Sequence, residues 1–199
     1  MQTITDINNI SRRRFLAAGL GVAAVGLVPN AGAAGQQYGI YGQRAPELEV
    51  EYWIDPSGAP THFDLSSAQG KWVFLKCFQN WCPGCHSHGF PALKKISDAF
   101  ADNPGVLVAG IQTTFEGFST NTVDKVRELQ LHYDLRIPMG HDAGDPDGDH
   151  RPVTMRNYRT GGTPWMILID PERRVVFNDF SIDSDKLIEV LNARTIQPA

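Results

Sequence analysis

Two cysteines separated by two residues, Cys82 and Cys85, are the side chains of this sequence best suited to chemistry. Two sulfurs at this spacing meet within one helical turn, so the pair predicts redox or metal chemistry. An apolar run of strand length, residues 72–78, precedes the pair, and Pro83 is tolerated in the first turn of a helix. Cys82 is therefore expected at a helix N-terminus, where unpaired N–H groups and the helix dipole stabilise a thiolate. We assign Cys82 as the attacking nucleophile and the more buried Cys85 as the resolving thiol.

The elements that must position this pair follow from apolar periodicity and turn residues. The predicted order is a hairpin, then β, α, β, α, β, a second hairpin and a closing helix. This alternation implies an α/β fold, with a central mixed sheet flanked by helices and an N-terminal β-hairpin extension. Strands are expected over residues 48–54, 61–65, 72–78, 106–111, 135–139, 165–169 and 174–177, and helices from about residue 82 to 100 and over residues 122–131 and 183–192.

Composition places most of the chain in one globular domain. Its 199 residues are 42% hydrophobic and 20% charged, which is typical of a soluble protein. The formal net charge of -4 gives no electrostatic reason to expect nucleic-acid binding. We expect a targeting segment over residues 1–34, a linker over 35–46 and one domain over 47–199 that acts as a monomer.

The first 34 residues have the order of an export signal. The stretch SRRRFL at residues 11–16 resembles the twin-arginine motif, and an uncharged run rich in Ala and Gly follows it. The apolar run from Phe15 to Val28 is about 14 residues long, shorter than the roughly 20 of a membrane-spanning helix. We expect cleavage near Ala33 after passage through the twin-arginine translocation machinery, and a periplasmic protein in which disulfides form. A general secretory signal and an uncleaved N-terminal membrane anchor are the alternatives.

Two separated stretches resemble landmarks of the thioredoxin superfamily. Residues 73–85, VFLKCFQNWCPGC, look like its strand and active-site loop, and residues 162–170, GTPWMILID, look like its cis-proline and the strand that follows. An exported chain with an N-terminal hairpin and an extra segment before the cis-proline resembles the TlpA/ResA-type thiol-disulfide oxidoreductases in particular. The resemblance covers about residues 45–195.

The resemblance also implies roles for the residues around the two sulfurs. A cis peptide is implied at Thr163–Pro164, with the Thr163 backbone pairing with an extended substrate segment and Pro164 leaving no competing N–H. Trp81, Pro83 and Gly84 complete the implied substrate-contacting set. The implied activity is exchange of a Cys82–Cys85 disulfide with protein thiols, without a cofactor or a metal. It requires an electron donor or acceptor that the sequence does not identify, and the sequence does not set the direction of exchange.

The sequence departs from the family pattern at three places near the cysteines. Lys76 stands six residues before Cys82, where thioredoxins carry a buried Asp. A charged Lys76 could favour a thiolate, or its side chain could extend to solvent. Pro91 comes nine residues after Cys82 rather than eight, which predicts one extra residue absorbed as a π-bulge or a broken turn near Gly89. Cys77 is additional, and we interpret it as a small buried core residue rather than a regulatory thiol.

Other chemistries compete for the same residues. The CPGCH sequence also matches the attachment pattern for c-type haem, but the preceding strand and the downstream cis-proline landmark argue against it. A thioredoxin-fold copper carrier could use both thiolates with His86 or His88, although we expect these histidines to be exposed helix residues. His86 could instead tune the nearby thiolate. A thiol peroxidase of the peroxiredoxin type would carry Thr where this chain has Gln79.

Residues 141–163 are predicted to be an inserted loop beside the site. Four aspartates between residues 142 and 149 are spaced partly as in a calcium loop, but the distal Glu is missing, so a solvated loop is favoured. Long loops are often functional, and this one could influence the choice of partner. Arg151, Arg156 and Arg159 could contact an acidic partner or could be ordinary surface charge.

Overall fold

Strand β3, Trp72–Phe78, lies in the interior of a seven-stranded mixed sheet and is buried along its whole length. β4, Val106–Thr114, pairs with it in parallel on one side, and β6, Trp165–Ile169, pairs antiparallel on the other. The strand order is β2-β1-β5-β4-β3-β6-β7, with β7 at Val175–Asp179. The predicted central mixed sheet is confirmed, and β3 and β6 have the predicted bounds. β4 is longer than predicted because Gln112, Thr113 and Thr114 are buried polar residues that the apolar pattern does not include.

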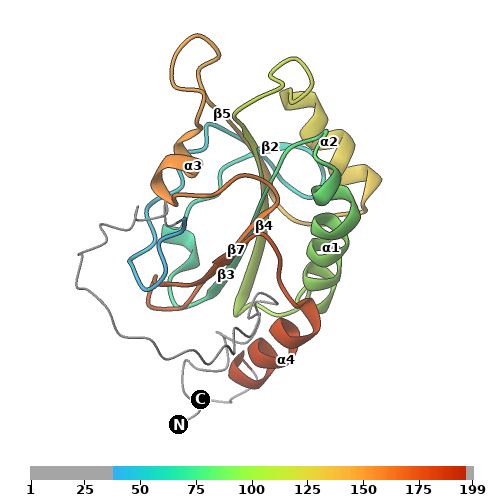
Figure 1. Ribbon diagram of the computed structural model, residues 1–199. Helices are drawn as coiled ribbons and strands as arrows, with labels where there is room; N and C mark the ends of the chain where they lie inside the picture. The colour runs from blue at the N-terminus through green and yellow to red at the C-terminus, as the bar shows by residue number, and fades with distance from the viewer. Residues whose placement is uncertain (1–37, 196–199) are drawn as a thin grey trace, which may run out of the picture.

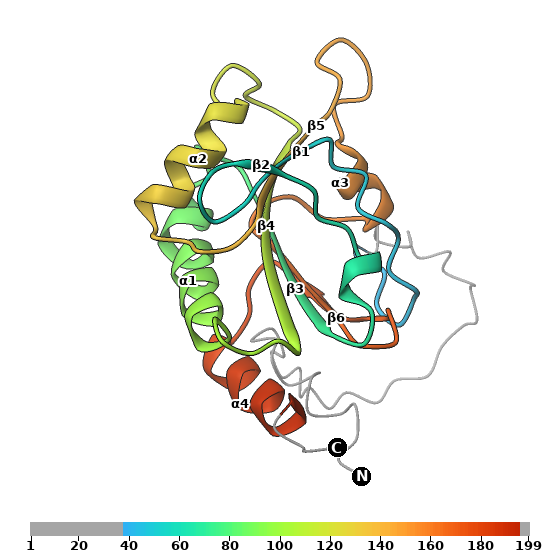
Figure 2. The same cartoon turned by 180° about the vertical axis from the view of Figure 1, so that it is seen from behind.

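The computed structural model describes residues 38–195, and helices cover both faces of the sheet (Figures 1 and 2). Three helices lie on one face: α1, Phe90–Ala99; α2, Val123–His132; and α4, Ser184–Thr195. A short helix α3, Val153–Asn157, and a 3-10 turn, Ser66–Ala68, lie on the other. Each face of the sheet therefore has its own hydrophobic core.

Alternation along β3 decides which core each of its side chains enters. Successive side chains of a strand point to opposite faces. Phe74 and Phe78 pack in the core under α1, whereas Leu75 and Cys77 pack in the core under α3. Lys76 falls on the α1 face by the same alternation, and its ammonium lies over the Phe78 ring. The strand therefore places the Lys76 side chain beneath the helix that carries the cysteine pair.

The predicted N-terminal hairpin is present but shorter than expected. β1, Tyr52–Ile54, pairs antiparallel with β2, Pro60–Thr61. Asp55 organises the turn between them, because its carboxylate accepts the Ser57 N–H at 2.8 Å and the Ala59 N–H at 3.0 Å. The expected strands over residues 48–54 and 61–65 are therefore too long. Residues 62–65 lead instead into the 3-10 turn.

The largest correction concerns the strand expected over residues 135–139. The strand β5 is Met139–Ala143, pairing in parallel with β4 and antiparallel with β1. Pro138 has no N–H to give to a ladder, and the Ile137 carbonyl accepts the Gln130 side-chain amide at 2.9 Å. The predicted loop over residues 141–163 is consequently shorter and contains α3.

The predicted linker over residues 35–46 is wrong for the part that the structure describes, 38–46. The Gly42 N–H donates to the Val175 carbonyl at 2.7 Å, so this segment pairs with the β7 edge of the sheet. Ile40 and Ala45 are 4% and 2% exposed and belong to the core under α3. The globular unit therefore begins earlier than residue 47.

The export-signal prediction, residues 1–34, lies outside the described residues. Within residues 38–195, no helix is long and apolar enough to cross a membrane.

Candidate active site

Cys82 lies between the end of β3 and the helix that follows it. The Cys82 N–H donates to the Gln79 carbonyl at 3.3 Å, which turns the chain sharply after the strand. The Cys82 carbonyl then accepts the N–H groups of Cys85 and His86 at 3.0 and 3.3 Å. The N–H of Cys85 also lies 3.2 Å from the Cys82 sulfur. Cys82 therefore occupies a helix N-terminus, with a backbone donor directed at its sulfur.

The two thiols have opposite electrostatic environments. Both are free thiols in this structure, and Cys82 is 5% exposed while Cys85 is fully buried. A hydrogen bond from the Cys85 thiol, the backbone N–H of Cys85 and the charge of Lys76 lower the pKa of Cys82 to about 5. Hydrogen bonding to Cys82 and burial raise the pKa of Cys85. At neutral pH this favours a thiolate at Cys82 and a protonated thiol at Cys85.

A π-helical turn, Cys85–Gly89, connects the cysteines to α1. Its last bond runs from the Phe90 N–H to the Cys85 carbonyl, one residue longer than an α-helical bond. Pro91 follows in the first turn of α1, where a missing N–H costs little. The extra residue predicted from the late position of Pro91 is thus absorbed as a π-bulge.

Lys76 lies beneath this turn and is completely buried. Its Nζ lies 3.5 Å from the centroid of the Phe90 ring and has no hydrogen-bond partner in the described part of the chain. A side chain at Gly89 would collide with it, since a Cβ there would stand 2.5 Å from the Lys76 Cε. Burial lowers the pKa of Lys76 to about 8, against the opposing effect of the cysteine charges, Cys85 foremost. The interpretation that this side chain extends to solvent is wrong.

His86 is held in place by two partners instead of lying exposed on the helix. Its Nδ1 is 2.6 Å from the Tyr133 hydroxyl, and its Nε2 hydrogen-bonds the Asn80 carbonyl. Tyr133 also stacks on Phe90, with ring centroids 4.3 Å apart. The expectation of an exposed residue is therefore wrong for His86 and confirmed for His88. Both ring nitrogens of His86 are engaged in fixing the start of the helix.

The second landmark lies directly against the cysteine pair. The Thr163–Pro164 peptide is cis, as the resemblance implied. The Cys82 sulfur lies 3.5 Å from the Thr163 carbonyl oxygen. A Cβ at Gly84 would stand 3.2 Å from the Pro164 ring, so glycine allows the two segments to approach this closely. Residues 81 positions apart in the sequence are thereby brought into one site.

Trp81 presents an apolar surface beside the sulfurs. Its side chain is 47% exposed, and its indole N–H donates to the Gln79 side-chain oxygen at 2.8 Å. The same oxygen accepts the Asn121 amide at 3.1 Å, and Asn121 in turn accepts the Asn80 N–H at 2.6 Å. Gln79 and Asn121 are positioning residues that the sequence prediction missed. No local pattern links them, because they are 42 residues apart.

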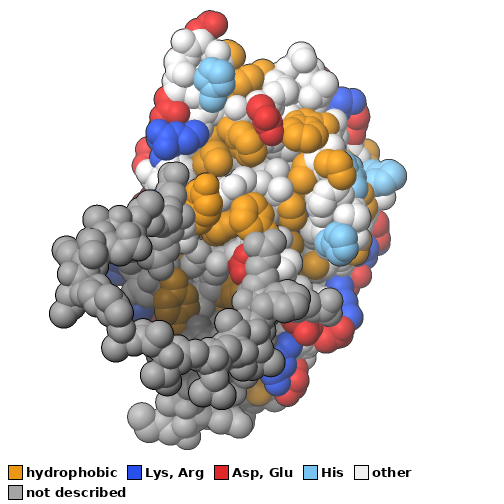
Figure 3. Space-filling model, in the orientation of Figure 1, with side chains coloured by type: hydrophobic (Ala, Val, Ile, Leu, Met, Phe, Trp, Pro, Cys, Tyr) orange, Lys and Arg blue, Asp and Glu red, His pale blue; other side chains and the backbone are white. Residues whose placement is uncertain are grey.

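The surface around the site is rich in apolar groups. Figure 3 shows hydrophobic side chains gathered across the middle of this face, with charged groups mainly at its margins. Pro83 is exposed next to Trp81, while Thr163 and Pro164 are half-buried. The structure therefore brings together all the predicted substrate-contacting residues: Trp81, Pro83, Gly84, Thr163 and Pro164.

Asp142 and Cys77 are both buried. Asp142 is buried, and its carboxylate accepts the N–H of Thr154 at 2.7 Å and of Val153 at 3.2 Å at the start of α3. The solvated-loop interpretation is wrong for this aspartate, whose pKa is raised by burial. No group of three or more His, Cys, Asp or Glu side chains suited to a metal ion occurs within residues 38–195. Burial raises the pKa of Cys77 to about 12, so this thiol is protonated and inert at neutral pH.

Solved structures of known proteins share this fold. The crystal structure of a thioredoxin-like superfamily protein, SPOA0173, is 31% identical, with a TM-score of 0.67 over 78% of this chain and 97% of that chain. A thiol-disulfide isomerase from Corynebacterium glutamicum is 29% identical, with a TM-score of 0.65 over 78% of this chain and 98% of that one. A secreted Mycobacterium tuberculosis disulfide oxidoreductase, homologous to Escherichia coli DsbE, shares the fold at 24% identity and a TM-score of 0.50, over 72% and 95% of the two chains.

These likenesses and the sheet topology define a thioredoxin-like oxidoreductase fold. The model of the AhpC/TSA family matches residues 41–178, and the chain belongs to this family. A search of curated proteins gives no match. The predicted fold class and the prediction of an oxidoreductase are both confirmed.

Proposed function

We propose that the protein is an exported, monomeric thiol-disulfide oxidoreductase of the TlpA/ResA type. In this proposal Cys82 and Cys85 exchange a disulfide with protein thiols. One observation carries it: the Cys82 sulfur, at a helix N-terminus, has a backbone donor 3.2 Å away and a pKa of about 5, while Cys85 behind it is buried and protonated. An attacking thiolate backed by a resolving thiol is the arrangement that exchange requires.

In the reducing direction, the Cys82 thiolate attacks one sulfur of a substrate disulfide. A Cys82–substrate disulfide forms, the substrate S–S bond breaks, and one substrate thiolate leaves and takes up a proton from solvent. Cys85 then loses its proton and attacks the Cys82 sulfur, which releases the second substrate thiol. Two electrons pass from the cysteine pair to the substrate, and the reverse sequence oxidises a substrate dithiol. An electron donor or acceptor outside the chain completes the cycle.

Substrate docking is assigned to the surface around the cis-proline. An extended substrate segment would pair with the Thr163 backbone, whose carbonyl lies 3.5 Å from the Cys82 sulfur. Pro164 has no N–H that could compete for the substrate. The exposed indole of Trp81 offers an apolar contact to either side chain that flanks a substrate cysteine.

Lys76 replaces the buried acid of thioredoxins by a buried cation. With a pKa of about 8 it is mainly protonated at neutral pH, so it stabilises negative charge on both sulfurs and is not available as a base. The second step needs a Cys85 thiolate. The positive charge of Lys76 lowers the free-energy cost of removing the Cys85 proton. We propose that the positive charge of Lys76 stabilises the thiolate forms of both cysteines.

The family match supports a second candidate function, reduction of peroxides. A Cys82 thiolate could attack a peroxide oxygen to give a sulfenic acid and release water or an alcohol, and Cys85 could then form the disulfide with loss of water. Gln79, at the position where the peroxiredoxin pattern has Thr, donates no hydroxyl to such a peroxide. We therefore rank disulfide exchange first.

The proposal is tested with four forms of the full chain: the parent, Cys82→Ser, Cys85→Ser and Cys77→Ser. Reduction of a protein disulfide is expected from the parent and from Cys77→Ser, and is expected to be absent from Cys82→Ser. Retained exchange in Cys82→Ser would refute the assignment. Faster consumption of hydrogen peroxide than of the protein disulfide would favour the second candidate. A redox titration against glutathione fixes the direction, because thioredoxin-fold potentials range from roughly -270 to about -120 mV.

Export is tested by fractionation. Replacing Arg12 and Arg13 by Lys is expected to leave the protein in the cytoplasm, since the proposal routes it through the twin-arginine machinery. Mass spectrometry of the periplasmic protein reads whether the chain is cut near Ala33 or retains an N-terminal anchor.

A further inference from the structure

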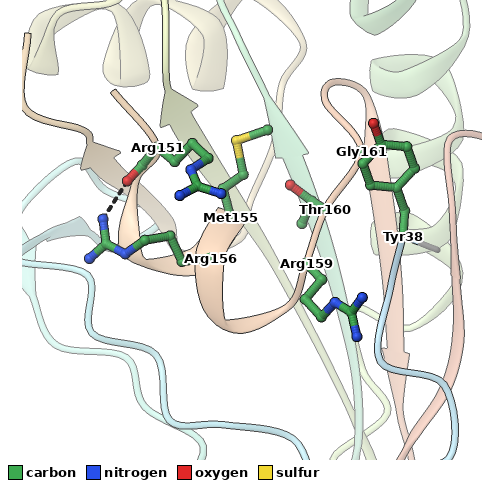
Figure 4. Close-up of a pocket in the computed structure, with 7 residues that line it drawn as sticks. All are labelled: Tyr38, Arg151, Met155, Arg156, Arg159, Thr160 and Gly161. Atoms are coloured by element: carbon green, nitrogen blue, oxygen red, sulfur yellow. Dashed lines mark hydrogen bonds between the residues drawn. The ribbon is translucent and has the colours of Figure 1, made fainter. Parts of the chain in front are cut away.

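A cavity of about 270 Å³ lies beside the cis-proline loop and has a strongly basic lining (Figure 4). Among residues 38–195, seven residues line it, of which three are arginines and none is acidic. The figure shows Arg151, Met155 and Arg156 on one side, Thr160 and Arg159 between, and Tyr38 on the other side, contributed by the first described residues of the chain. Gly161 completes the lining where the loop turns toward Thr163.

The backbone that carries this lining is firmly anchored. Asp142 binds the first N–H groups of α3, and the Tyr158 hydroxyl donates to the Pro46 carbonyl at 2.6 Å. The Arg156 guanidinium donates to the Arg151 carbonyl, which closes the turn before α3. The N–H of Gly39 donates to the Arg159 carbonyl at 2.7 Å and fixes the segment that carries Tyr38. The cavity is therefore preformed and does not require a folding step.

Among the described residues, positive charge exceeds negative charge around Arg151 and Arg156. Asp149 receives two hydrogen bonds from Arg151, at 3.1 and 3.3 Å, and lies 4.0 Å from Arg156. One carboxylate thus faces two guanidinium groups, whose side chains remain 59% and 41% exposed. A guanidinium presents five N–H donors in a planar fork that matches a carboxylate. Arg151 and Arg156 therefore retain donors for a second carboxylate.

The Gly161 edge of the cavity is close to the reacting sulfur. Gly161 lies two residues before Thr163, whose carbonyl is 3.5 Å from the Cys82 sulfur. Two residues of backbone span at most about 8 Å. An extended substrate segment rises about 3.3 Å per residue, so it covers the path from the sulfur to this edge in roughly two to four residues.

We propose that this cavity binds a carboxylate side chain of the partner polypeptide, located two to four residues from its reacting cysteine. Tyr38 and Met155 would pack against the aliphatic part of a Glu or Asp side chain, and the fork donors of Arg151 and Arg156 would bind its carboxylate. The proposed substrate class is protein disulfides with a nearby acidic residue. This inference rests on the proposed exchange function.

The experiment compares three synthetic peptide disulfides that differ at one position, Glu, Gln or Lys, placed in turn two, three and four residues from the cysteine. The reduced full chain is mixed with each peptide, and the second-order rate constant of peptide reduction is measured. At low ionic strength the Glu peptide is expected to react about five- to tenfold faster than the Gln peptide at one or more spacings, and the Lys peptide more slowly. The preference is expected to shrink in 0.5 M salt, because the arginines are exposed to solvent.

Charge variants assign the effect to this cavity. In Arg151→Gln/Arg156→Gln the Glu preference is expected to fall to about onefold, and in Asp149→Asn it is expected to rise about twofold. Arg136→Gln is the matched control, since Arg136 is an exposed arginine that lines a different cavity, with Pro56. Far-ultraviolet circular dichroism and the alkylation rate of Cys82 verify that the variants are folded.

The outcomes separate this inference from the function on which it rests. Equal rates for the Glu and Gln peptides at every spacing, or an unchanged preference in the double variant, would overturn the carboxylate site while leaving exchange intact. If Arg151 and Arg156 affect the rate of reduction only when the substrate is glutathione disulfide, the carboxylate site is also overturned. Failure to reduce any peptide would contradict the proposed function itself.

Discussion

Replacing Lys76 by Met separates the electrostatic role of this residue from its effect on stability. Met has a similar length and no charge, so it fills the space above Phe90 without a buried ammonium. Two opposite effects are expected from this one substitution. The folded state should become more stable, and the Cys82 thiolate should become less stable.

The stability effect follows from the pKa of Lys76. Burial lowers that pKa from 10.5 to about 8, which corresponds to ~3 kcal/mol of penalty for the charged form in the fold. The penalty is complete below about pH 8 and disappears above 10.5, because between these values the unfolded state holds more protons. After subtraction of about 1–2 kcal/mol for the lost contact with the Phe90 ring, Lys76→Met should stabilise the fold by roughly 1–2 kcal/mol at pH 7. The gain should vanish near pH 10.5.

The redox effect follows from the lost positive charge. The positive charge of Lys76 is one of the causes that lower the pKa of Cys82. The pKa of Cys82 should therefore rise in Lys76→Met. Only the reduced form contains a thiolate, so its loss of stabilisation should make the potential more negative, by about 30 mV for each unit by which the pKa of Cys82 rises.

Denaturant unfolding at pH 7 and pH 10.5, alkylation of Cys82 against pH and a glutathione titration measure these three quantities. Lys95→Met is the matched control, because Lys95 belongs to α1 but is 49% exposed and pairs with Asp185. A folded Lys76→Met protein with an unchanged Cys82 pKa and an unchanged potential would refute the electrostatic reasoning. A less stable protein at pH 7 would refute the assigned cost of burial.

Three further predictions concern neighbouring residues. The rate of Cys82 alkylation should rise with pH through about 5 and be nearly level at neutral pH, because the thiolate is the reacting form; a midpoint near 8.5 would contradict the low pKa. Gly84→Val should slow disulfide exchange by at least about tenfold with little change in fold, because its branched side chain meets the Pro164 ring; an unchanged rate in a steady-state assay would show that this approach is unimportant. Asp142→Ala should destabilise the protein by about 1–3 kcal/mol in denaturant unfolding, since it leaves two N–H groups at the start of α3 without their acceptor; full stability would contradict that role.

The sequence predicted those parts of the fold in which local pattern and tertiary packing agree. β3 was predictable because all seven of its residues are buried, although one of them is Lys76. The π-helical turn was predictable from the position of Pro91, since one residue too many must be absorbed before the proline. The cysteine pair was predictable from its spacing and its place between strand and helix.

Long-range polar partners explain most of what the sequence did not predict. His141 and Asp142 look like loop residues, yet they belong to β5, because Gln112 and the start of α3 provide their hydrogen bonds. His86 was expected to be exposed because its partner Tyr133 is 47 residues away. The segment before residue 47 resembles a linker because its Gly-rich composition does not reveal that its backbone pairs with β7.

The central claim is that Cys82 attacks and Cys85 resolves. The most direct measurement is to mix reduced Cys85→Ser protein with a disulfide-containing substrate protein and to map the product by peptide mass spectrometry. The account predicts a stable mixed disulfide at Cys82, which parent Cys85 would otherwise release, and none at Cys77. A mixed disulfide at Cys77 would contradict it. A mixed disulfide that forms in Cys82→Ser protein but not in Cys85→Ser protein would contradict it as well.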